Sequence, residues 1–449
     1  MVNNSIHSNM TVRFDELGSP INTKALALTF GDKNIVLIAL DISGVKNSHS
    51  DPMRKAIAAG IGVNPDEIIL SASHSHSTPF LEPMDGPHPY FDFVLRQSVE
   101  AAKEAWKSLR PARFGHDVIY VVGASFNTRV PMPDGGVKFT RDFREGLASG
   151  RPIDPRLNII RFDDENGKPI AGWVRFATHP ACVIFNTPIS GEYPGYLTER
   201  LSETVAGGTP VLFGYGASGD LNCIPMFGSE SDSRNLGRQL ADLVAPAFEK
   251  IHTKKPRRFL YGNRTVDLPL DPAPSIEILD KEIEEIKTFI KALDTNPELE
   301  WVMGINCKKK WPVKNKINHV KPLAEWAELM KQALKSGRKF PLTWPSEITA
   351  LIIDDMGLVF YPGEPFAELG FALSAQSPLK ETLLMGMSNG ANGYIGTDED
   401  RLRGGYETYS SVRYSKLKEG LRPLPYALGA GELLIGNCIS LIDELCGKK

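Results

Sequence analysis

Between residues 24 and 262, short apolar runs alternate with longer amphipathic stretches, in which apolar and polar positions are mixed. The runs are rich in β-branched residues and read as strands, in the segments KALALTF, NIVLIALDI, EIILSAS, NIIRFDD, GWVRFATH and TPVLFGYGA. The amphipathic stretches predict helices over residues 51–62, 90–109 and 229–251. In the first of them we expect Asp51 to cap the helix and Pro52 to occupy its first position. The mixture predicts an α/β or α+β fold, with layered mixed sheets flanked by helices.

Residues 263–345 change this pattern. Segments 274–293 and 322–337 predict two helices rich in Glu–Lys pairs four residues apart, and a basic loop is expected between them at 307–321. The simplest interpretation is a solvated, Lys-rich helical insertion at 263–345 within a single domain that spans residues 1–449. The alternative is that its lysines face a substrate or a partner. Residues 346–449 return to strands and end in helices.

Composition narrows the class of protein. A hydrophobic content of 42% with 23% charged residues is that of a globular protein, and a net charge of −3 gives no electrostatic reason to expect nucleic acid. The apolar run IVLIAL is far shorter than the roughly 20 residues of a membrane span. Five cysteines form no CxxC pair, and the first 20 residues show no secretory leader. We therefore expect a cytoplasmic protein with a small-molecule substrate.

The segment SASHSHSTPF, residues 71–80, places two of the nine histidines one residue apart among small side chains. If the preceding strand continues through them, His74 and His76 point to the same face, because side chains alternate along a strand. The pair is then either part of a metal site or two hydrated surface histidines. The spacing alone does not decide between these alternatives.

Other polar residues stand where strands end or turns begin. His179 follows a strand and precedes a proline, Glu364 lies at a strand-to-helix turn, and Tyr394 and Arg129 lie in polar loops. Each has an ordinary structural interpretation, as has the glycine-rich turn at 216–225. Together with the SASHSHSTPF segment they supply two histidines and a carboxylate, the usual ligands of a catalytic zinc with an open position. Such a zinc lowers the pKa of bound water to about 7 and requires no nucleophilic side chain.

Five segments, in order along the chain, resemble motifs of the neutral (non-lysosomal) ceramidase family. They are LSASHSHSTP, DPRLNIIRFDDENGKPIAGWVRFATHP, ASGDLNCIP, YPGEPF and NGYIGTDEDRLRGGYE. The family counterparts are LSATHTHSGP, DPxxxxLRFDxxxGxPIGxxxxFAVHG, GDVSPN, PGE and GYVTTPEEYxxxxYE. The similarity extends discontinuously from about residue 24 to residue 410, and it implies the fold of that family's catalytic domain.

The resemblance also implies roles for particular residues. It assigns one zinc ion per chain to His74, His179, Glu364 and Tyr394, although Mn²⁺ or Fe²⁺ would fit the same ligand set. It assigns proton transfer or hydrogen bonding at the reacting group to His76. Tyr406, with Arg129, is expected to stabilise the oxyanion.

Two departures from the family pattern bear on activity. Asn222 replaces the serine of GDVS, so a mechanism that needs this hydroxyl is in doubt, while attack by zinc-bound water survives the change. Because only 43 residues follow Tyr406, we expect this sequence to lack the family's C-terminal immunoglobulin-like domain. The continuation after the HxH motif is also changed, to STPFLEPMDGPHPYF, which favours a smaller or more polar substrate than a long-chain sphingolipid.

The expected activity is zinc-dependent hydrolysis of the C–N bond of a linear amide. Two alternatives remain open. In the first, the same metal site acts on an ester, a lactone or a sugar-derived substrate. In the second, the chain is a non-catalytic binding protein that retains the fold, for which Asn222 is the suggestive feature.

Overall fold

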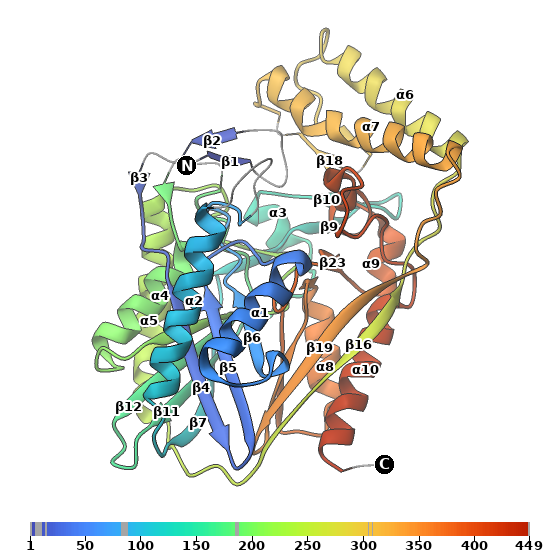
Figure 1. Cartoon of the computed structure of the whole chain (residues 1–449). Coiled ribbons are helices and arrows are strands. Elements are labelled where there is room, and N and C mark those ends of the chain that lie inside the picture. Colours follow the sequence, from blue (N-terminus) through green and yellow to red (C-terminus); the bar gives the residue numbers. More distant parts are fainter. Residues whose placement is uncertain are drawn as a thin grey trace.

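Three mixed β-sheets form the centre of the molecule (Figure 1). The computed structural model describes residues 2–4, 11–13, 16–81, 89–184, 188–303, 305–307 and 309–447. In spatial order the first sheet consists of β4 (Thr23–Phe30), β5 (Lys33–Leu40) and β6 (Ile68–Ala72). The second consists of β14 (Val211–Tyr215), β12 (Pro169–Phe176), β11 (Arg156–Asp163) and β7 (Arg113–Tyr120). The third consists of β16 (Phe259–Pro269), β19 (Thr343–Ile353), β20 (Met356–Phe360) and β22 (Glu381–Met385).

Each sheet contains one parallel pair, and the parallel pairs are β5–β6, β12–β14 and β20–β22. Both faces of the central strands are buried. Along β5, Ile35 and Leu37 pack in a cluster shared by all three sheets, whereas Val36 and Ile38 pack against the helical side. This division follows from the alternation of side chains along a strand. It explains why the central strands are continuously apolar rather than alternating.

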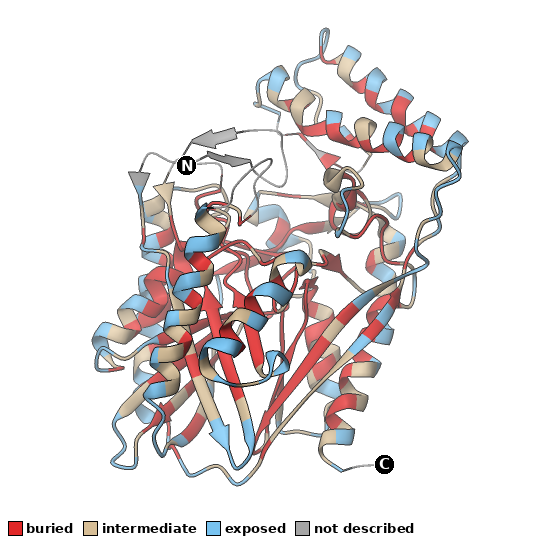
Figure 2. Ribbon diagram, viewed as in Figure 1, coloured by how far each residue is buried: buried red, intermediate tan, exposed pale blue. Residues whose placement is uncertain are grey.

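Helices cover the outer faces of the sheets. On the first two sheets they are α1 (Asn47–Ile61), α2 (Pro89–Lys107), α4 (Glu192–Thr204) and α5 (Glu230–Lys250). On the third they are α8 (Ala367–Gln376) and α10 (Ala430–Leu445). Figure 2 shows that their buried residues face the sheets and their exposed residues face outward. The layered, mixed α/β class that the hydrophobic pattern predicts is confirmed. Among the helices that the structure describes, none combines the length and apolar character that crossing a bilayer requires.

The start of α1 corrects one prediction. The helix begins at Asn47, four residues before the predicted cap at Asp51, and Pro52 lies inside it. The reason is tertiary. The Asn47 side chain donates to Asn392 Oδ1 at 2.8 Å and accepts from the Ala391 backbone at 3.2 Å. These partners are more than 340 residues away in the sequence, so local capping rules could not identify this start.

The helical hairpin within residues 263–345 consists of α6 (Ile276–Ala292) and α7 (Val313–Lys335). It extends from the end of the long β16–β19 ladder, which pairs Phe259 with Ile353 and Pro269 with Thr343 (Figure 1). Both ends of the predicted insertion therefore belong to strands of the third sheet. The loop predicted at 307–321 is wrong from Val313 onward, where α7 begins. Lys316 in this segment is buried, and its Nζ donates to the carbonyls of Pro297 and Leu299 at 2.7 and 2.8 Å.

The remaining elements are short and include several that carry functional side chains. The strands are β1 (Val2–Asn4), β2 (Thr11–Arg13), β3 (Glu16–Leu17), β8 (Ser125–Asn127), β9 (Arg129–Pro131), β10 (Val137–Phe139), β13 (Pro188–Ile189), β15 (Leu221–Cys223), β17 (Trp301–Val302), β18 (Ile305–Asn306), β21 (Glu364–Pro365) and β23 (Tyr394–Ile395). The helices and turns are α3 (Phe143–Ala148), α9 (Asp398–Arg403), the 3₁₀ turns η1 (Pro65–Glu67) and η3 (Ser411–Ser415), and the π-helical turn η2 (Tyr406–Ser410).

Candidate active site

The candidate site lies where one strand of each central sheet ends. His74 follows β6, His179 follows β12, and Glu364 follows β20. Each of these strands is paired in parallel with a neighbour, and the carboxyl ends of such strands are where α/β proteins commonly place their ligands. All three side chains are buried. The sheets therefore bring together residues that are up to 290 positions apart in the sequence.

His74 and His76 are not on a strand. β6 ends at Ala72, and His74 adopts a left-handed backbone conformation with φ of 66°, so the predicted strand continuation is wrong. The backbone N–H of His74 donates to the carbonyl of Ile42 at 3.0 Å, which holds the turn against the first sheet. The two imidazole rings are nevertheless 4.7 Å apart and nearly perpendicular. A non-glycine residue with positive φ costs backbone free energy, as at many functional sites.

Backbone carbonyls fix the protonation of His74 and His179. Nδ1 of His74 lies 2.5 Å from the carbonyl oxygen of Ser43, and Nδ1 of His179 lies 2.7 Å from that of Ser218. A carbonyl can only accept, so Nδ1 carries the proton in both rings. In the neutral imidazole, Nε2 is then a lone-pair acceptor. Metal-binding histidines commonly show this arrangement, since the bond at one nitrogen orients the other toward the ion.

Both Nε2 atoms point at the same oxygen of Glu364. Oε2 lies 3.2 Å from Nε2 of His74 and 3.1 Å from Nε2 of His179. Burial would raise the pKa of Glu364, but positive charge on the imidazoles beside it lowers that pKa well below its usual value, and a cation bound between the three groups would act in the same sense. Two lone pairs and a carboxylate oxygen repel one another unless positive charge lies between them. The donor set therefore fits a cation, and one ring nitrogen each of His74, His76 and His179 lie within 4.8 Å of one another.

Tyr394 lies directly beside Glu364. β21 and β23 pair in parallel with these two residues as register partners, and the Glu364 N–H donates to the Gly393 carbonyl at 3.0 Å. The Tyr394 ring stacks 6.3 Å from that of His179. Tyr406, the first residue of η2, packs edge-on to Tyr394 at 5.9 Å. Burial raises the pKa of Tyr406 well above its usual value, so its hydroxyl keeps its proton at neutral pH.

Asn222 occupies the wall of the site next to His179, to which it forms an isolated parallel bridge. Its buried Oδ1 accepts no hydrogen bond from the described residues. The turn that leads to it is packed closely, because a Cβ at Gly219 would lie 2.4 Å from the carbonyl oxygen of Glu364. Asp220 anchors the same turn by accepting from Asn127 at 2.6 Å and from the Ala367 N–H at 2.9 Å. Sequence reasoning did not identify Asp220, although it forms part of the ASGDLN motif.

Arg129 lies outside the described lining of the pocket. Its guanidinium is 1% exposed and pairs with Glu407 at 2.7 Å and Asp400 at 3.4 Å. It also lies over the ring of Phe366 at 5.2 Å. These partners are protein groups, so the placement does not support the expected contact with an oxyanion. Arg129 instead joins β9 to η2, the turn that carries Tyr406.

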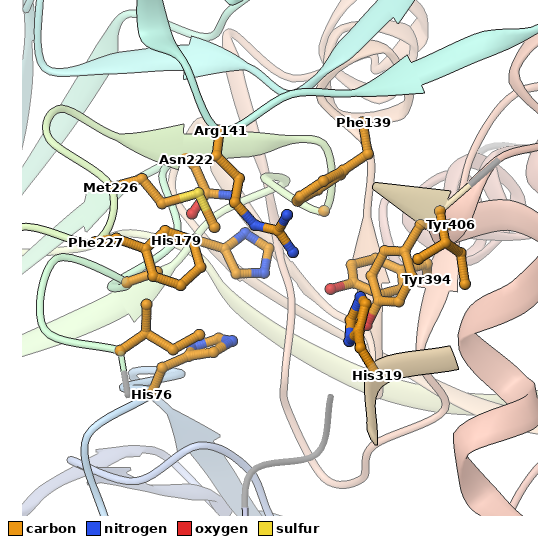
Figure 3. Close-up of a pocket in the computed structure, with 14 residues that line it drawn as sticks. His76, Phe139, Arg141, His179, Asn222, Met226, Phe227, His319, Tyr394 and Tyr406 are labelled. Atoms are coloured by element: carbon orange, nitrogen blue, oxygen red, sulfur yellow. The ribbon is translucent and has the colours of Figure 1, made fainter. Parts of the chain in front are cut away.

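A pocket of about 50 Å³ has His76 and His179 on one side and Tyr394, Tyr406 and His319 on the other (Figure 3). Its described lining is His76, Phe139, Arg141, His179, Ala181, Ile184, Gly219, Asn222, Met226, Phe227, Ile305, His319, Tyr394 and Tyr406. His319 comes from α7 and Ile305 from β18, so the insertion contributes to the site through these residues, and none of its lysines that the structure describes lines the pocket. The sequence analysis did not identify Arg141 and His319, because an isolated Arg or His in a polar segment forms no recognisable motif.

The fold and the site together define a layered α/β protein with a histidine–carboxylate centre at the ends of its sheets. No family model and no curated protein matches this chain by sequence. Among solved structures it is similar to one described as a ceramidase complexed with C2, with 17% identity and a TM-score of 0.63. It is also similar to the neutral ceramidase from Pseudomonas aeruginosa, with 16% identity and a TM-score of 0.59. Both alignments cover 97% of this chain and 74% of the other. The chain thus has a neutral ceramidase-like fold, as the motif resemblance predicts.

Proposed function

We propose that this protein is a metal-dependent hydrolase that cleaves the C–N bond of an N-acyl amide. The observation that carries the proposal is the convergence of the His74 and His179 Nε2 atoms on one carboxylate oxygen of Glu364. This donor set, with Tyr394 beside it, would hold the ion, and zinc is the metal that the histidine–carboxylate chemistry favours. When bound, such an ion polarises a carbonyl and acidifies water. The neutral ceramidase-like fold supports an amide as the substrate.

Three residues around the centre, His76, Tyr406 and Asn222, can each contribute to hydrolysis in a different way. Nδ1 of His76 lies 2.9 Å from the carbonyl of His74 and donates to it, so Nε2 is the nitrogen of this pocket-lining ring that can exchange a proton with the leaving amine. The neutral hydroxyl of Tyr406 can donate to an oxyanion. The buried Oδ1 of Asn222, which accepts no hydrogen bond from the described residues, can accept the N–H of the substrate amide.

The first test measures metal content and turnover on the same purified protein. We expect about one divalent ion per chain by mass spectrometry and hydrolysis of N-acyl amides of medium chain length. A chelator should abolish turnover, and added zinc should restore it. Glu364→Gln should lose both metal and activity, while His252→Ala, at an exposed histidine, should retain both.

The same assay distinguishes the alternatives. Esters, lactones and glycosides are offered beside the amides at equal concentration. If the protein hydrolyses one of these classes faster than every amide, the bond that it cleaves belongs to that class and is not an amide. Stoichiometric metal without turnover on the whole panel would favour a binding protein, and a folded chain that takes up no metal would contradict the proposal.

A further inference from the structure

Arg141 brings a positive charge into the pocket. It follows β10 in the chain, and its guanidinium reaches into the space between His179 and the two tyrosines (Figure 3). Among the described residues that line the pocket, Arg141 carries the only permanent charge. The other polar lining groups are histidine, asparagine and tyrosine side chains. Arg141 therefore brings a charged hydrogen-bond donor to the pocket beside the candidate metal centre.

Three aromatic rings surround this guanidinium. Its central carbon lies 5.2 Å from the centre of the Phe139 ring, 5.4 Å from that of Phe227 and 5.0 Å from that of Trp311. Such contacts stabilise a guanidinium and restrict its rotation. Although the residue as a whole is partly exposed, the guanidinium is enclosed, and burial lowers the pKa of Arg141 to about 10. It is therefore protonated at neutral pH.

We propose that Arg141 binds a carboxylate of the substrate, so that the substrate is an N-acyl amino acid. A guanidinium and a carboxylate match in a planar, two-pronged geometry, and such a pair is strong when water is excluded. In an N-acyl amino acid the carboxylate is one carbon from the amide nitrogen, so it must bind in the same pocket as the reacting carbonyl. Arg141 and His179 share that pocket. The apolar side chains of Ile184, Met226 and Phe227 offer a surface for the acyl chain.

This inference rests on the proposed function for the identity of the bond, but binding can be tested without turnover. The probes are N-octylsulfonyl-leucine and its carboxamide, which present the same sulfonamide to the metal centre and resist hydrolysis. Calorimetry on the full, metal-loaded protein compares them in the wild type, in Arg141→Gln, in Arg141→Lys and in Arg144→Gln. Arg144 is exposed and lies outside the pocket, so it provides the matched control.

We expect the wild type and R144Q to bind the acid at least about tenfold more tightly than the carboxamide, as a charged hydrogen bond allows. R141Q should lose this preference. R141K should keep part of it, because lysine retains the positive charge but cannot form two parallel hydrogen bonds to one carboxylate. Equal binding of the two probes by the wild type, or an undiminished preference in R141Q, would overturn the proposal.

Turnover then separates carboxylate binding from oxyanion stabilisation. R141Q should lower kcat/KM for N-octanoyl-leucine far more than for N-octanoyl-leucinamide. An equal loss for both substrates would place Arg141 at the oxyanion and contradict the inference. If the wild type hydrolyses neither amide, the proposed function fails, and the sulfonamide measurements still decide whether Arg141 recognises a carboxylate.

Discussion

His74 and His76 lie two residues apart and use their rings differently. His74 is buried, and its Nε2 points to Glu364 beneath the pocket. His76 is partly exposed and lines the pocket itself. The left-handed conformation at His74 creates this difference in depth, because a regular strand would present both rings at one level. Both rings could still approach one ion, since their nitrogens belong to the same histidine group.

Two alanine variants test this division of roles. His74→Ala removes a nitrogen that faces Glu364, so we expect metal content to fall from about one ion per chain to near zero. His76→Ala should retain the metal and lower kcat by about 100-fold or more, as loss of a proton-transfer group does. Elemental analysis and initial rates on the same samples provide both readouts. Loss of metal in His76→Ala would make His76 a ligand and contradict the assignment.

At the scale of elements, a buried ion pair holds the turn that carries Tyr406. Glu407 in η2 accepts from Arg129 at 2.7 Å and from Thr128 Oγ1 at 3.1 Å. Arg129 also donates to the carbonyl of Gly404, just before the turn, at 2.9 Å. A π-helical turn is rare and is often found at functional sites. The pair thus positions Tyr406 from a strand almost 280 residues earlier in the chain.

Removing only the positive partner of this ion pair should lower the free energy of unfolding. Arg129→Met leaves the Glu407 carboxylate buried without its cation, so we expect the free energy of unfolding to fall by about 3–5 kcal/mol. The double variant Arg129→Met/Glu407→Gln removes both charges and should cost less than the single one. Urea unfolding followed by tryptophan fluorescence measures the difference. A single variant within about 1 kcal/mol of the wild type would contradict the role of the pair.

These elements also show how far one sequence can predict a site. The five motifs identified His74, His179, Glu364 and Tyr394 as a group, and the structure places them together. The sequence did not distinguish Arg129, which pairs with buried acids, from Arg141, which faces the pocket. Both stand in polar segments, and only their distant partners separate them. Lys316 is a similar case, since its buried ammonium is satisfied by carbonyls that no local pattern reveals.

At the scale of the whole molecule, Glu192 links two of the sheet ends that form the site. Its carboxylate is fully buried and accepts from the His76 N–H and from Ser77 Oγ after β6, at 3.2 and 3.0 Å. It also accepts from the Val183 N–H after β12 at 3.2 Å. Burial raises the pKa of Glu192 from 4.5 to about 8, in spite of these hydrogen bonds. Folding therefore becomes linked to pH through this group.

The sign of this linkage gives a stability prediction. In the unfolded chain the carboxyl loses its proton near pH 4.5, whereas the folded chain keeps it until about pH 8. The contribution of Glu192 is thus fully present below pH 4.5 and is lost as the pH rises through 8. Glu192→Gln cannot titrate, so its unfolding free energy should fall less than that of the wild type between pH 5 and pH 8. Urea unfolding at both pH values tests this, and parallel changes in the two proteins would contradict it.

The sequence by itself determined the layered mixed class, most strands and helices, and the group of candidate site residues His74, His179, Glu364 and Tyr394, because these depend on local periodicity and on short motifs. Only the tertiary structure decided which arginine faces the pocket, that the insertion supplies His319 and Ile305, and that His74 in SASHSHSTPF adopts a left-handed conformation just after the strand. These features depend on contacts between segments far apart in the chain. The burial, the partners and the pKa of a side chain all depend on such contacts. A local sequence pattern contains no information about the distant groups that will surround that side chain.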